Sequence, residues 1–387
     1  MNKHTPGPQP TAEEHAKGMA AYFEAGKQRA LNLGNRGPIR LGPDGRLTDD
    51  ILAAYRETGF YVFENAIGAE ELAELRADVD GALATAPTDP DSSVDKAGNP
   101  VPGLQFTRNP YRFAKPLSDP LGGTSKNKGR HPVQVAQPTP GASAPEMTIE
   151  LLHGNLHLMD SALRLYGHPG LLAAAATVLG DDFVPYNEVT FIKEPGLGPS
   201  VAWHQDGTTH WDADDWDPDA HGFNFMSQLY PSTPGNGVWV IPGSHRMGRV
   251  DIKQLATDSG SERIDGAVPL ICEGGDVIMN NRQLVHGSFA NSSPDRRVTL
   301  NAGFFARSRV AGITTQQLND QTETYDDERI HERSRIIQIG IDARHQRFPE
   351  EERFVYQPLA DRQDENRWSE DTRATVVKNY NLRDMYI

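Results

Sequence analysis

Five short apolar runs, with turns but no helical pattern between them, are the feature that most constrains the fold of this chain. They cover residues 183–193, 222–230, 238–241, 276–280 and 297–305. Glycine- and proline-rich turns separate the runs, and short strands punctuated in this way are typical of a β-sandwich or barrel. The sequence therefore predicts a mainly β domain, with helices only at its flanks, so that the whole chain is of the α+β class.

The flanking helices are predicted from apolar residues at helical spacing. On the N-terminal side the spacing indicates helices over residues 51–56, 70–83 and 149–179, with a short strand over 59–63. Residues 1–48 are polar, apart from a short alanine-rich helical patch, and are predicted to be a peripheral segment. The strands and these helices together define a domain over residues 49–310.

Residues 86–148 interrupt that domain with a long irregular segment rich in Pro, Gly, Ser and Thr. A segment of this length in a compact enzyme is usually a lid or substrate loop, or else is disordered. Between residues 108 and 130 only Asp119 is acidic, against six basic residues: Arg108, Arg112, Lys115, Lys126, Lys128 and Arg130. Two interpretations stay open, namely a solvated loop and a lid that contacts an anion.

Residues 311–387 are polar and charged, and we expect a C-terminal extension of helical and irregular structure that packs on the core and is a candidate surface for a homodimer. The formal net charge of −15 argues against nucleic acid or an anionic membrane as a partner. The sequence shows no signal peptide and no apolar run of membrane-spanning length. Cys272 is the only cysteine, which excludes an internal disulfide and fits the reducing cytoplasm.

A metal site is indicated where a histidine and a carboxylate stand two residues apart. His204-Gln205-Asp206 follows an apolar run, and residues i and i+2 of a strand point to the same face, so both side chains can reach one metal. His286, in Leu-Val-His-Gly-Ser, is the best candidate for a third ligand. The same spacing recurs in His210-Trp211-Asp212, but this copy stands in an acidic loop, so we assign the metal to the first pair. Two histidines and one carboxylate suit Fe(II) in oxygenases, since they leave one face of the metal open.

The order of short motifs around these residues resembles the phytanoyl-CoA dioxygenase family of Fe(II)/2-oxoglutarate oxygenases. It runs from Trp-His-Gln-Asp at 203–206 through Asn-Gly at 236–237, Pro-Gly-Ser-His at 242–245 and Gly-Asp at 275–276 to His-Gly-Ser at 286–288, followed by arginine. The resemblance implies a double-stranded β-helix, a cupin-like jelly roll, with the metal at its mouth. It also implies that Fe(II), 2-oxoglutarate and O₂ are the cofactor and co-substrates, and that the histidine at 245 is structural.

The resemblance further implies an arginine that pairs with the distal carboxylate of 2-oxoglutarate. Arg296 and Arg297 both stand nearby, but neighbours on a strand face opposite ways. With Arg297 facing inward, Thr299, Asn301 and Gly303 face inward too, while apolar residues face outward. Arg297 also lies 297 − 286 = 11 residues after the last ligand, as in the family, and we expect the Thr299 hydroxyl to contact the same carboxylate.

Further contacts to 2-oxoglutarate are predicted from the strand over 222–230. Asn224, Met226 and Gln228 alternate there and share one face. The family often carries an inward tryptophan where Met226 stands, so Gln228 or Asn224 is expected to supply the polar contact. On the run over 183–193, Asn187, Val189 and Phe191 share a face in the same way.

The resemblance implies hydroxylation, or a related oxidation, of an unactivated C–H in a small molecule, with release of succinate and CO₂. Because Asp206 is retained, halogenation is disfavoured: related halogenases carry a small residue there and leave room for chloride. Desaturation and ring-forming oxidation stay open, as does the substrate's identity. Two alternatives keep the fold but change the class, namely a non-oxidative metal-binding or sensing protein and a zinc hydrolase with the same ligands. Neither class of protein needs the arginine that follows His286 in the sequence.

Overall fold

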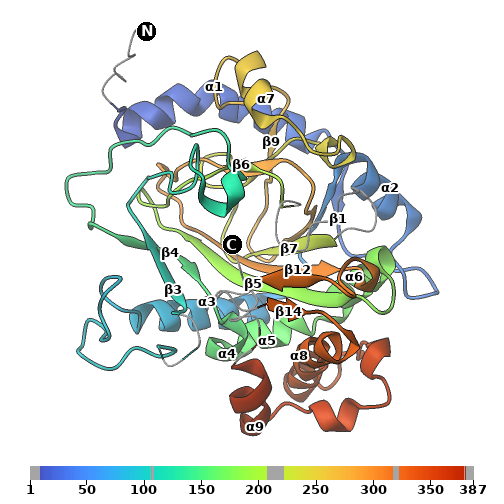
Figure 1. The fold of residues 1–387 in the computed structure, drawn as a ribbon. Coiled ribbons are helices and arrows are strands. Elements are labelled where there is room, and N and C mark those ends of the chain that lie inside the picture. The colour runs from blue at the N-terminus through green and yellow to red at the C-terminus, as the bar shows by residue number, and fades with distance from the viewer. Residues whose placement is uncertain are drawn as a thin grey trace.

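Two β-sheets face one another in the computed structural model, which describes residues 9–104, 106, 109–206, 222–316, 322–378 and 380. The larger sheet has the strand order β1-β2-β10-β7-β12-β5-β4-β3, and the smaller has the order β6-β11-β8-β9. All neighbouring strands run antiparallel except β1 and β2. The two sheets form the jelly roll that the sequence predicts (Figure 1).

The large sheet consists of β1 (Arg36–Gly37), β2 (Phe60–Phe63), β3 (Tyr111–Ala114), β4 (Thr148–Leu152), β5 (Val184–Lys193), β7 (Gly222–Gln228), β10 (Val277–Asn281) and β12 (Arg297–Phe305). The small sheet consists of β6 (Val201–His204), β8 (Trp239–Val240), β9 (Val268–Pro269) and β11 (His286–Ser288). A separate hairpin pairs β13 (Thr314–Gln316) with β14 (Thr322–Thr324).

The α-helices are α1 (Ala12–Leu31), α2 (Asp49–Thr58), α3 (Ala69–Ala84), α4 (Asn155–Leu158), α5 (Asp160–Tyr166), α6 (Pro169–Leu179), α7 (Ile252–Asp258), α8 (Asp327–Arg347) and α9 (Glu370–Thr372). Short helical turns cover Lys126–Gly129, Ser244–Arg246, Arg307–Arg309, Gln357–Leu359, Gln363–Asn366 and Arg373–Val377. Among the described residues, no helix is both long and apolar enough to cross a membrane.

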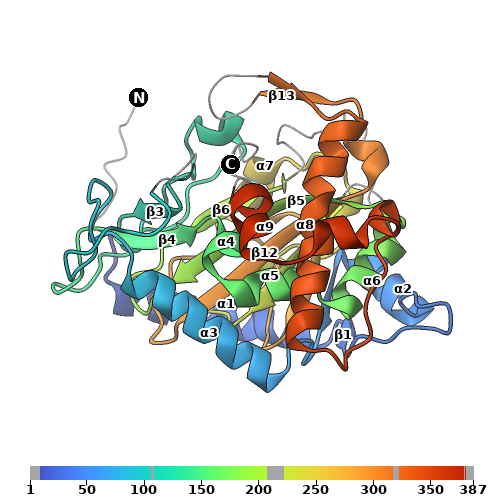
Figure 2. The same cartoon turned by 90° about the horizontal axis from the view of Figure 1, so that it is seen from below.

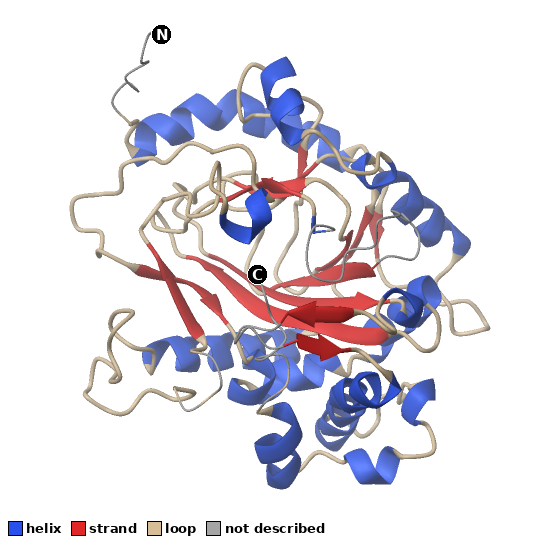
Figure 3. Ribbon diagram, in the orientation of Figure 1, coloured by secondary structure: helices blue, strands red, loops and turns tan. Residues whose placement is uncertain are grey.

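Helices cover the outer face of each sheet, as Figure 3 shows by colour. α1 packs on β9 of the small sheet, while α4 and α8 pack on β5 of the large sheet. In the view from below, α8 crosses the outer face of the large sheet next to α5 (Figure 2). The main hydrophobic core lies between these helices and the large sheet. The division into residues 1–48, 49–310 and 311–387 stays a prediction.

The alternation along β12 separates the core from the interior of the jelly roll. Val298 and Leu300 belong to the main core beneath the helices. Arg297, Thr299 and Asn301 point the other way, into a pocket between the sheets. A strand with a helix layer on one side and a polar pocket on the other must alternate in this way, because successive side chains point to opposite faces.

The helix predicted over residues 149–179 is wrong at its start. Thr148–Leu152 is strand β4, which pairs with β3 through Tyr111–Ala114 and with β5 through Leu151 and Leu152. The helical region then begins only after Gly154, which has a left-handed φ of 70°. The sequence predicted a helix here because a short run of apolar residues fits the helical repeat and the strand repeat equally well. Only the pairing with neighbouring strands decides between helix and strand.

Glu188 on β5 lies beneath α4 and makes folding stability depend on pH. Its carboxylate accepts hydrogen bonds from the backbone N–H of Gly154 (3.1 Å) and Asn155 (3.0 Å), yet burial raises its pKa to about 8. The folded protein therefore holds a proton that the unfolded chain, with an ordinary pKa of 4.5, releases. The unfavourable burial of the ionised Glu188 carboxylate therefore does not affect the free energy of unfolding below pH 4.5. As the pH rises towards about 8, the folded protein is progressively destabilised relative to the unfolded chain.

We expect the free energy of unfolding of the wild type to fall between pH 5 and pH 8 more steeply than that of the Glu188→Gln variant. Urea denaturation at both pH values measures the difference. The same pH dependence in both proteins would show that Glu188 does not carry a raised pKa. Glu64→Gln, at a half-buried position just after β2, is the matched control.

Candidate metal centre

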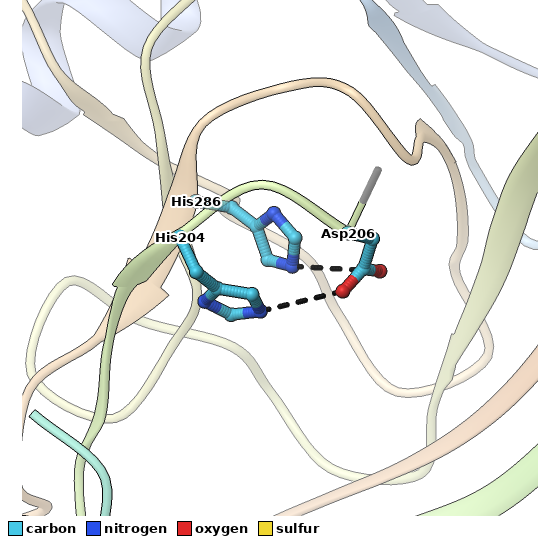
Figure 4. Close-up of side chains that lie close together, drawn as sticks. All are labelled: His204, Asp206 and His286. Atoms are coloured by element: carbon cyan, nitrogen blue, oxygen red, sulfur yellow. Dashed lines mark ion pairs between the residues drawn. The ribbon is translucent and has the colours of Figure 1, made fainter. Parts of the chain in front are cut away.

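Three side chains meet where β6 and β11 lie side by side. His204 ends β6, His286 begins β11, and the two residues are direct partners in the antiparallel register. Their rings are 4.1 Å apart between centroids. Asp206 follows β6 and turns back toward both histidines, with its Oδ1 3.5 Å from His204 Nε2 and its Oδ2 3.9 Å from His286 Nε2 (Figure 4). Ligand atoms from all three residues lie within 4.8 Å of one another.

Hydrogen bonds from the far side of each ring aim the two histidines at this point. His204 Nδ1 lies 2.8 Å from the carbonyl oxygen of Ala202, and His286 Nδ1 lies 2.8 Å from that of Leu284. A carbonyl accepts only, so Nδ1 carries the proton in each ring and the Nε2 lone pair points to the centre. Burial lowers the pKa of His286 to about 4, so this imidazole is neutral and able to bind a metal at neutral pH.

Asp206 is the one carboxylate of the three, and it is held ionised. Burial alone would raise its pKa, but the positive charges of Arg282 and Arg130 keep the pKa well below the usual range. Two imidazoles and one carboxylate thus fit a divalent metal, and a ligand set without sulfur suits iron as well as zinc.

Other residues hold Asp206 in place. Asn224 Nδ2 donates to Asp206 Oδ2 at 2.9 Å, and Arg130 Nη1 lies 3.4 Å from Oδ1. Arg282 Nη2 donates to the Asp206 carbonyl at 3.0 Å, while the Asp206 N–H donates to the Arg282 carbonyl at 2.8 Å. Bonds of this kind orient a ligand before the metal arrives. Asn224, expected at 2-oxoglutarate, thus donates a hydrogen bond to the candidate ligand Asp206, and its contact with 2-oxoglutarate stays a prediction.

A pocket extends from the three ligands to Arg297, which is 3% exposed. Arg297 Nε donates to Thr299 Oγ1 at 2.8 Å, and its Nη1 donates to the carbonyl of Asn236 at 3.1 Å. Burial lowers the pKa of Arg297 to about 10, so the guanidinium stays charged at neutral pH. Among the described residues no carboxylate forms an ion pair with it. A buried cation without an anion is costly, and it suits an anionic ligand.

Arg296 points away from this pocket. Its Nη1 lies 2.7 Å from Asp80 Oδ1 and its Nε lies 3.0 Å from Glu194 Oε1, at the surface of the domain. The inward position of Arg297 on β12 is thus the one that the alternation predicts.

The remaining residues predicted at 2-oxoglutarate lie at different depths. Thr299 Oγ1 accepts from Arg297 and donates to Gln228 Oε1 at 2.9 Å, so its proton is already used. Gln228 lies behind Thr299, and its amide donates to the Met226 carbonyl at 3.3 Å. Met226 lines the pocket and is 6% exposed. Thr299 and Gln228 therefore brace Arg297.

Two residues next to the arginine had no assigned role in the sequence. Ser288 lines the pocket, and its hydroxyl accepts from Lys193 Nζ at 2.8 Å. Lys193 is the direct partner of Arg297 in the β5–β12 register, and its Nζ also donates to the Phe289 carbonyl at 2.6 Å. The motif His-Gly-Ser could have indicated Ser288. Lys193 could not be found, because its place depends on how two distant strands pair.

The long segment over residues 86–148 reaches into the site. The ring of His131 lies 4.4 Å from that of His204 between centroids, and Arg130 contacts Asp206. Arg112 also lines the pocket, where its Nε lies 2.6 Å from Glu150 Oε1. The second pair with the same spacing, His210 and Asp212, to which the sequence did not assign the metal, lies outside the described residues, as does Arg108.

A jelly roll with two histidines and one carboxylate at one point, and a buried arginine in the same pocket, fits a mononuclear non-haem metal enzyme. The sequence profile of the phytanoyl-CoA dioxygenase (PhyH) family matches residues 55–299. The chain belongs to this family, and it is an iron(II)- and 2-oxoglutarate-dependent dioxygenase.

Individual relatives are more distant. The chain is 27% identical over 273 residues to phytanoyl-CoA dioxygenase 1 of Oryza sativa subsp. japonica, covering 67% of this chain and 89% of the relative. Similar solved structures include EctD from S. alaskensis with 2-oxoglutarate and 5-hydroxyectoine, at 23% sequence identity and a TM-score of 0.47. The match covers 72% of this chain and 83% of that one. The non-heme alpha ketoglutarate dependent epimerase SnoN from nogalamycin biosynthesis is also similar, at 16% sequence identity and a TM-score of 0.44. The match covers 66% of this chain and 82% of that one.

Proposed function

We propose that this dioxygenase hydroxylates an unactivated C–H of a small molecule, with His204, Asp206 and His286 as the iron ligands and Arg297 as the residue that binds the distal carboxylate of 2-oxoglutarate. The observation that carries the assignment is the buried Arg297, which has no carboxylate partner among the described residues and shares one pocket with the three ligands. Iron bound at this centre supplies, with O₂ and 2-oxoglutarate, the oxidising power for C–H cleavage, while succinate and CO₂ are released.

The chain itself contributes geometry and charge. His204 and His286 present lone pairs fixed by their Nδ1 hydrogen bonds, and Asn224 orients the Asp206 carboxylate. Arg297 is held by Thr299 and by the carbonyl of Asn236, and its side chain lines the pocket. Because Arg297 is 3% exposed, water screens its charge little, which strengthens the charge–charge contact to a bound carboxylate.

The two alternative classes differ in what they need from this pocket. A zinc hydrolase or a metal-sensing protein requires the three ligands but has no use for the buried cation. Succinate formation that depends on both Fe(II) and 2-oxoglutarate supports the dioxygenase. Hydrolytic activity with Zn(II), and no succinate under any condition, would support the hydrolase.

The segment over residues 86–148 is proposed as a lid, because Arg130 and His131 contact metal ligands from it. We expect limited proteolysis to cut this segment first in the metal-free protein, and Fe(II) with 2-oxoglutarate to slow the cutting under anaerobic conditions. Gel bands identified by mass spectrometry give the cut sites. Equal cutting with and without ligands would refute the lid.

Cytoplasmic location and a homodimer also belong to the proposal. Cys272 is buried and unpaired, which suits a reducing compartment. For the homodimer, the polar C-terminal extension offers the surface, and light scattering of the full chain tests it.

A further inference from the structure

Arg282, in the turn between β10 and β11, holds the candidate ligand Asp206 by both of its backbone groups. The Asp206 N–H donates to the Arg282 carbonyl at 2.8 Å, and Arg282 Nη2 donates to the Asp206 carbonyl at 3.0 Å. The register between β6 and β11 ends at His204, two residues before Asp206. The two bonds to Arg282 therefore fix the backbone of Asp206 where strand pairing no longer does.

The guanidinium of Arg282 is itself held between two aromatic rings. It lies 4.4 Å from the ring centre of Tyr186 on β5 and 4.7 Å from that of Phe305 on β12. The two rings are 4.9 Å apart between centres, at an angle of 85°. Because Arg282 is 1% exposed, the rings and not the solvent set where its charge lies. A shift of either ring would move the guanidinium, and with it the bond to Asp206.

The regular ladder of the large sheet is interrupted at Tyr186. Two residues of β5, one of them Tyr186, stand opposite a single residue of β12, where the register shifts between Ala302 and Phe304. A bulge of this kind leaves one residue outside the regular hydrogen-bond pattern. The position of Tyr186 therefore depends on contacts from outside the sheet.

Residues of the C-terminal extension supply such contacts. Arg333 on α8 donates a hydrogen bond from Nη2 to the Tyr186 carbonyl, and the Tyr380 hydroxyl donates to the same oxygen at 3.3 Å. The Arg333 guanidinium lies 4.8 Å from the centre of the Tyr380 ring, so these two residues also hold one another. Helix α8 itself packs on β5, the strand that carries Tyr186 (Figure 2).

Apolar side chains of the extension share one buried cluster with the two rings. Tyr186 and Phe305 belong to this cluster together with Tyr325, which precedes α8, and Ile330, which lies on α8. Protein interiors are close-packed, so a complete cluster leaves its rings little room to move. The extension thus restrains both rings that hold the Arg282 guanidinium.

We propose that the C-terminal extension is part of the metal centre: through two aromatic rings of the jelly roll it keeps the Arg282 guanidinium where it fixes Asp206. Arg333 and Tyr380 act on the metal only through these rings, so they are positioning residues. The proposal rests on the proposed function, because it needs a metal that binds at Asp206.

The Mn(II) affinity of full-length variants tests the proposal without knowledge of the substrate. Arg333→Met removes the hydrogen bond to the Tyr186 carbonyl and keeps an unbranched apolar side chain on α8. We expect it to weaken Mn(II) binding about 3- to 30-fold, as for residues that couple to a site through a packed network. Calorimetric titration gives the affinity. The electron paramagnetic resonance spectrum of bound Mn(II) should also change, because Asp206 is displaced. Unchanged affinity and spectrum would overturn the proposal.

Arg344→Met separates this effect from a general loss of stability. Arg344 is also an α8 arginine that is 5% exposed, as Arg333 is, but it forms ion pairs with Glu71 and Glu351. Urea denaturation measures the stability of both variants. We expect Arg344→Met to be less stable than the wild type and to keep its Mn(II) affinity and spectrum. Equal losses of affinity in the two variants would show that the extension acts through stability alone, and the proposal would fail.

A double-mutant cycle shows whether the effect passes through Arg282. Arg282→Lys keeps the charge but loses the planar guanidinium, so it should weaken Mn(II) binding about 10- to 100-fold. In that background, Arg333→Met should change the affinity by less than about twofold. Additive losses in the double variant would mean that the extension reaches the metal by another route, which contradicts the proposal.

Tyr380→Phe takes the place of Arg333→Met in the same cycle if the latter does not fold. It removes only the hydroxyl that contacts the Tyr186 carbonyl. A loss of Mn(II) affinity that disappears in the Arg282→Lys background supports the proposal, and no loss in either background refutes it. If the wild type binds Mn(II) no better than His204→Ala, the proposed function fails, which is distinct from a wild-type site that does not respond to the extension.

Discussion

Alanine at His204, Asp206 or His286 abolishes 2-oxoglutarate-dependent succinate formation and weakens Fe(II) binding more than about 100-fold, since loss of an outer-sphere partner alone costs roughly 10–100-fold. Each substitution removes one of three ligands whose atoms lie within 4.8 Å of one another. The fold should persist, because the ligands stand at strand ends and the main core lies on the other side of the large sheet. Anaerobic titration with Fe(II), with circular dichroism for folding, measures both effects.

His210→Ala and Asp212→Ala are the matched controls, because this pair has the same spacing in sequence. Both variants should keep their iron and their turnover. Loss of iron in these two, with iron retained in the variants at 204 and 206, would transfer the metal site to the second pair.

Arg297→Ala raises the apparent KM for 2-oxoglutarate by about 30- to 5,000-fold, which corresponds to the roughly 2–5 kcal/mol lost when one partner of a buried charge pair is removed. The large effect is expected because Arg297 is 3% exposed and has no acidic partner among the described residues. Succinate formation at increasing 2-oxoglutarate gives the KM.

Two comparisons make this result specific. Arg296→Ala should change the KM far less, because Arg296 pairs with Asp80 and Glu194 outside the pocket. A 2-oxo acid without a distal carboxylate, such as 2-oxopentanoate, should bind wild type and Arg297→Ala equally weakly. If Arg297→Ala weakened both 2-oxo acids to the same extent, Arg297 would act through the fold and not through the distal carboxylate.

The fold class could be predicted from the family resemblance in the sequence, and much of the candidate site could be predicted from the spacing of residues along the chain. The two-residue spacing of His204 and Asp206 indicated the pair, but the strand geometry behind that expectation was wrong, because β6 ends at His204 and Asp206 lies beyond the strand and turns back toward the histidines. The polar–apolar alternation after Arg297 distinguishes it from Arg296, because one face of β12 meets a helix layer and the other a polar pocket. Wherever one face of a strand or helix is buried, the alternation of polar and apolar residues in the sequence shows which side chains lie on which face.

Tertiary structure alone decided which distant residues share the site. Lys193 comes opposite Arg297, and Asn224 comes to Asp206, only because β5, β12 and β7 pair in one register. Likewise, nothing in the composition of the segment over 86–148 indicates that Arg130 and His131 reach the metal ligands. Strand pairing and loop placement depend on contacts between residues far apart in the chain, and these leave no periodic signal in one sequence. For the same reason β4 resembled the start of a helix until its partners β3 and β5 were in view.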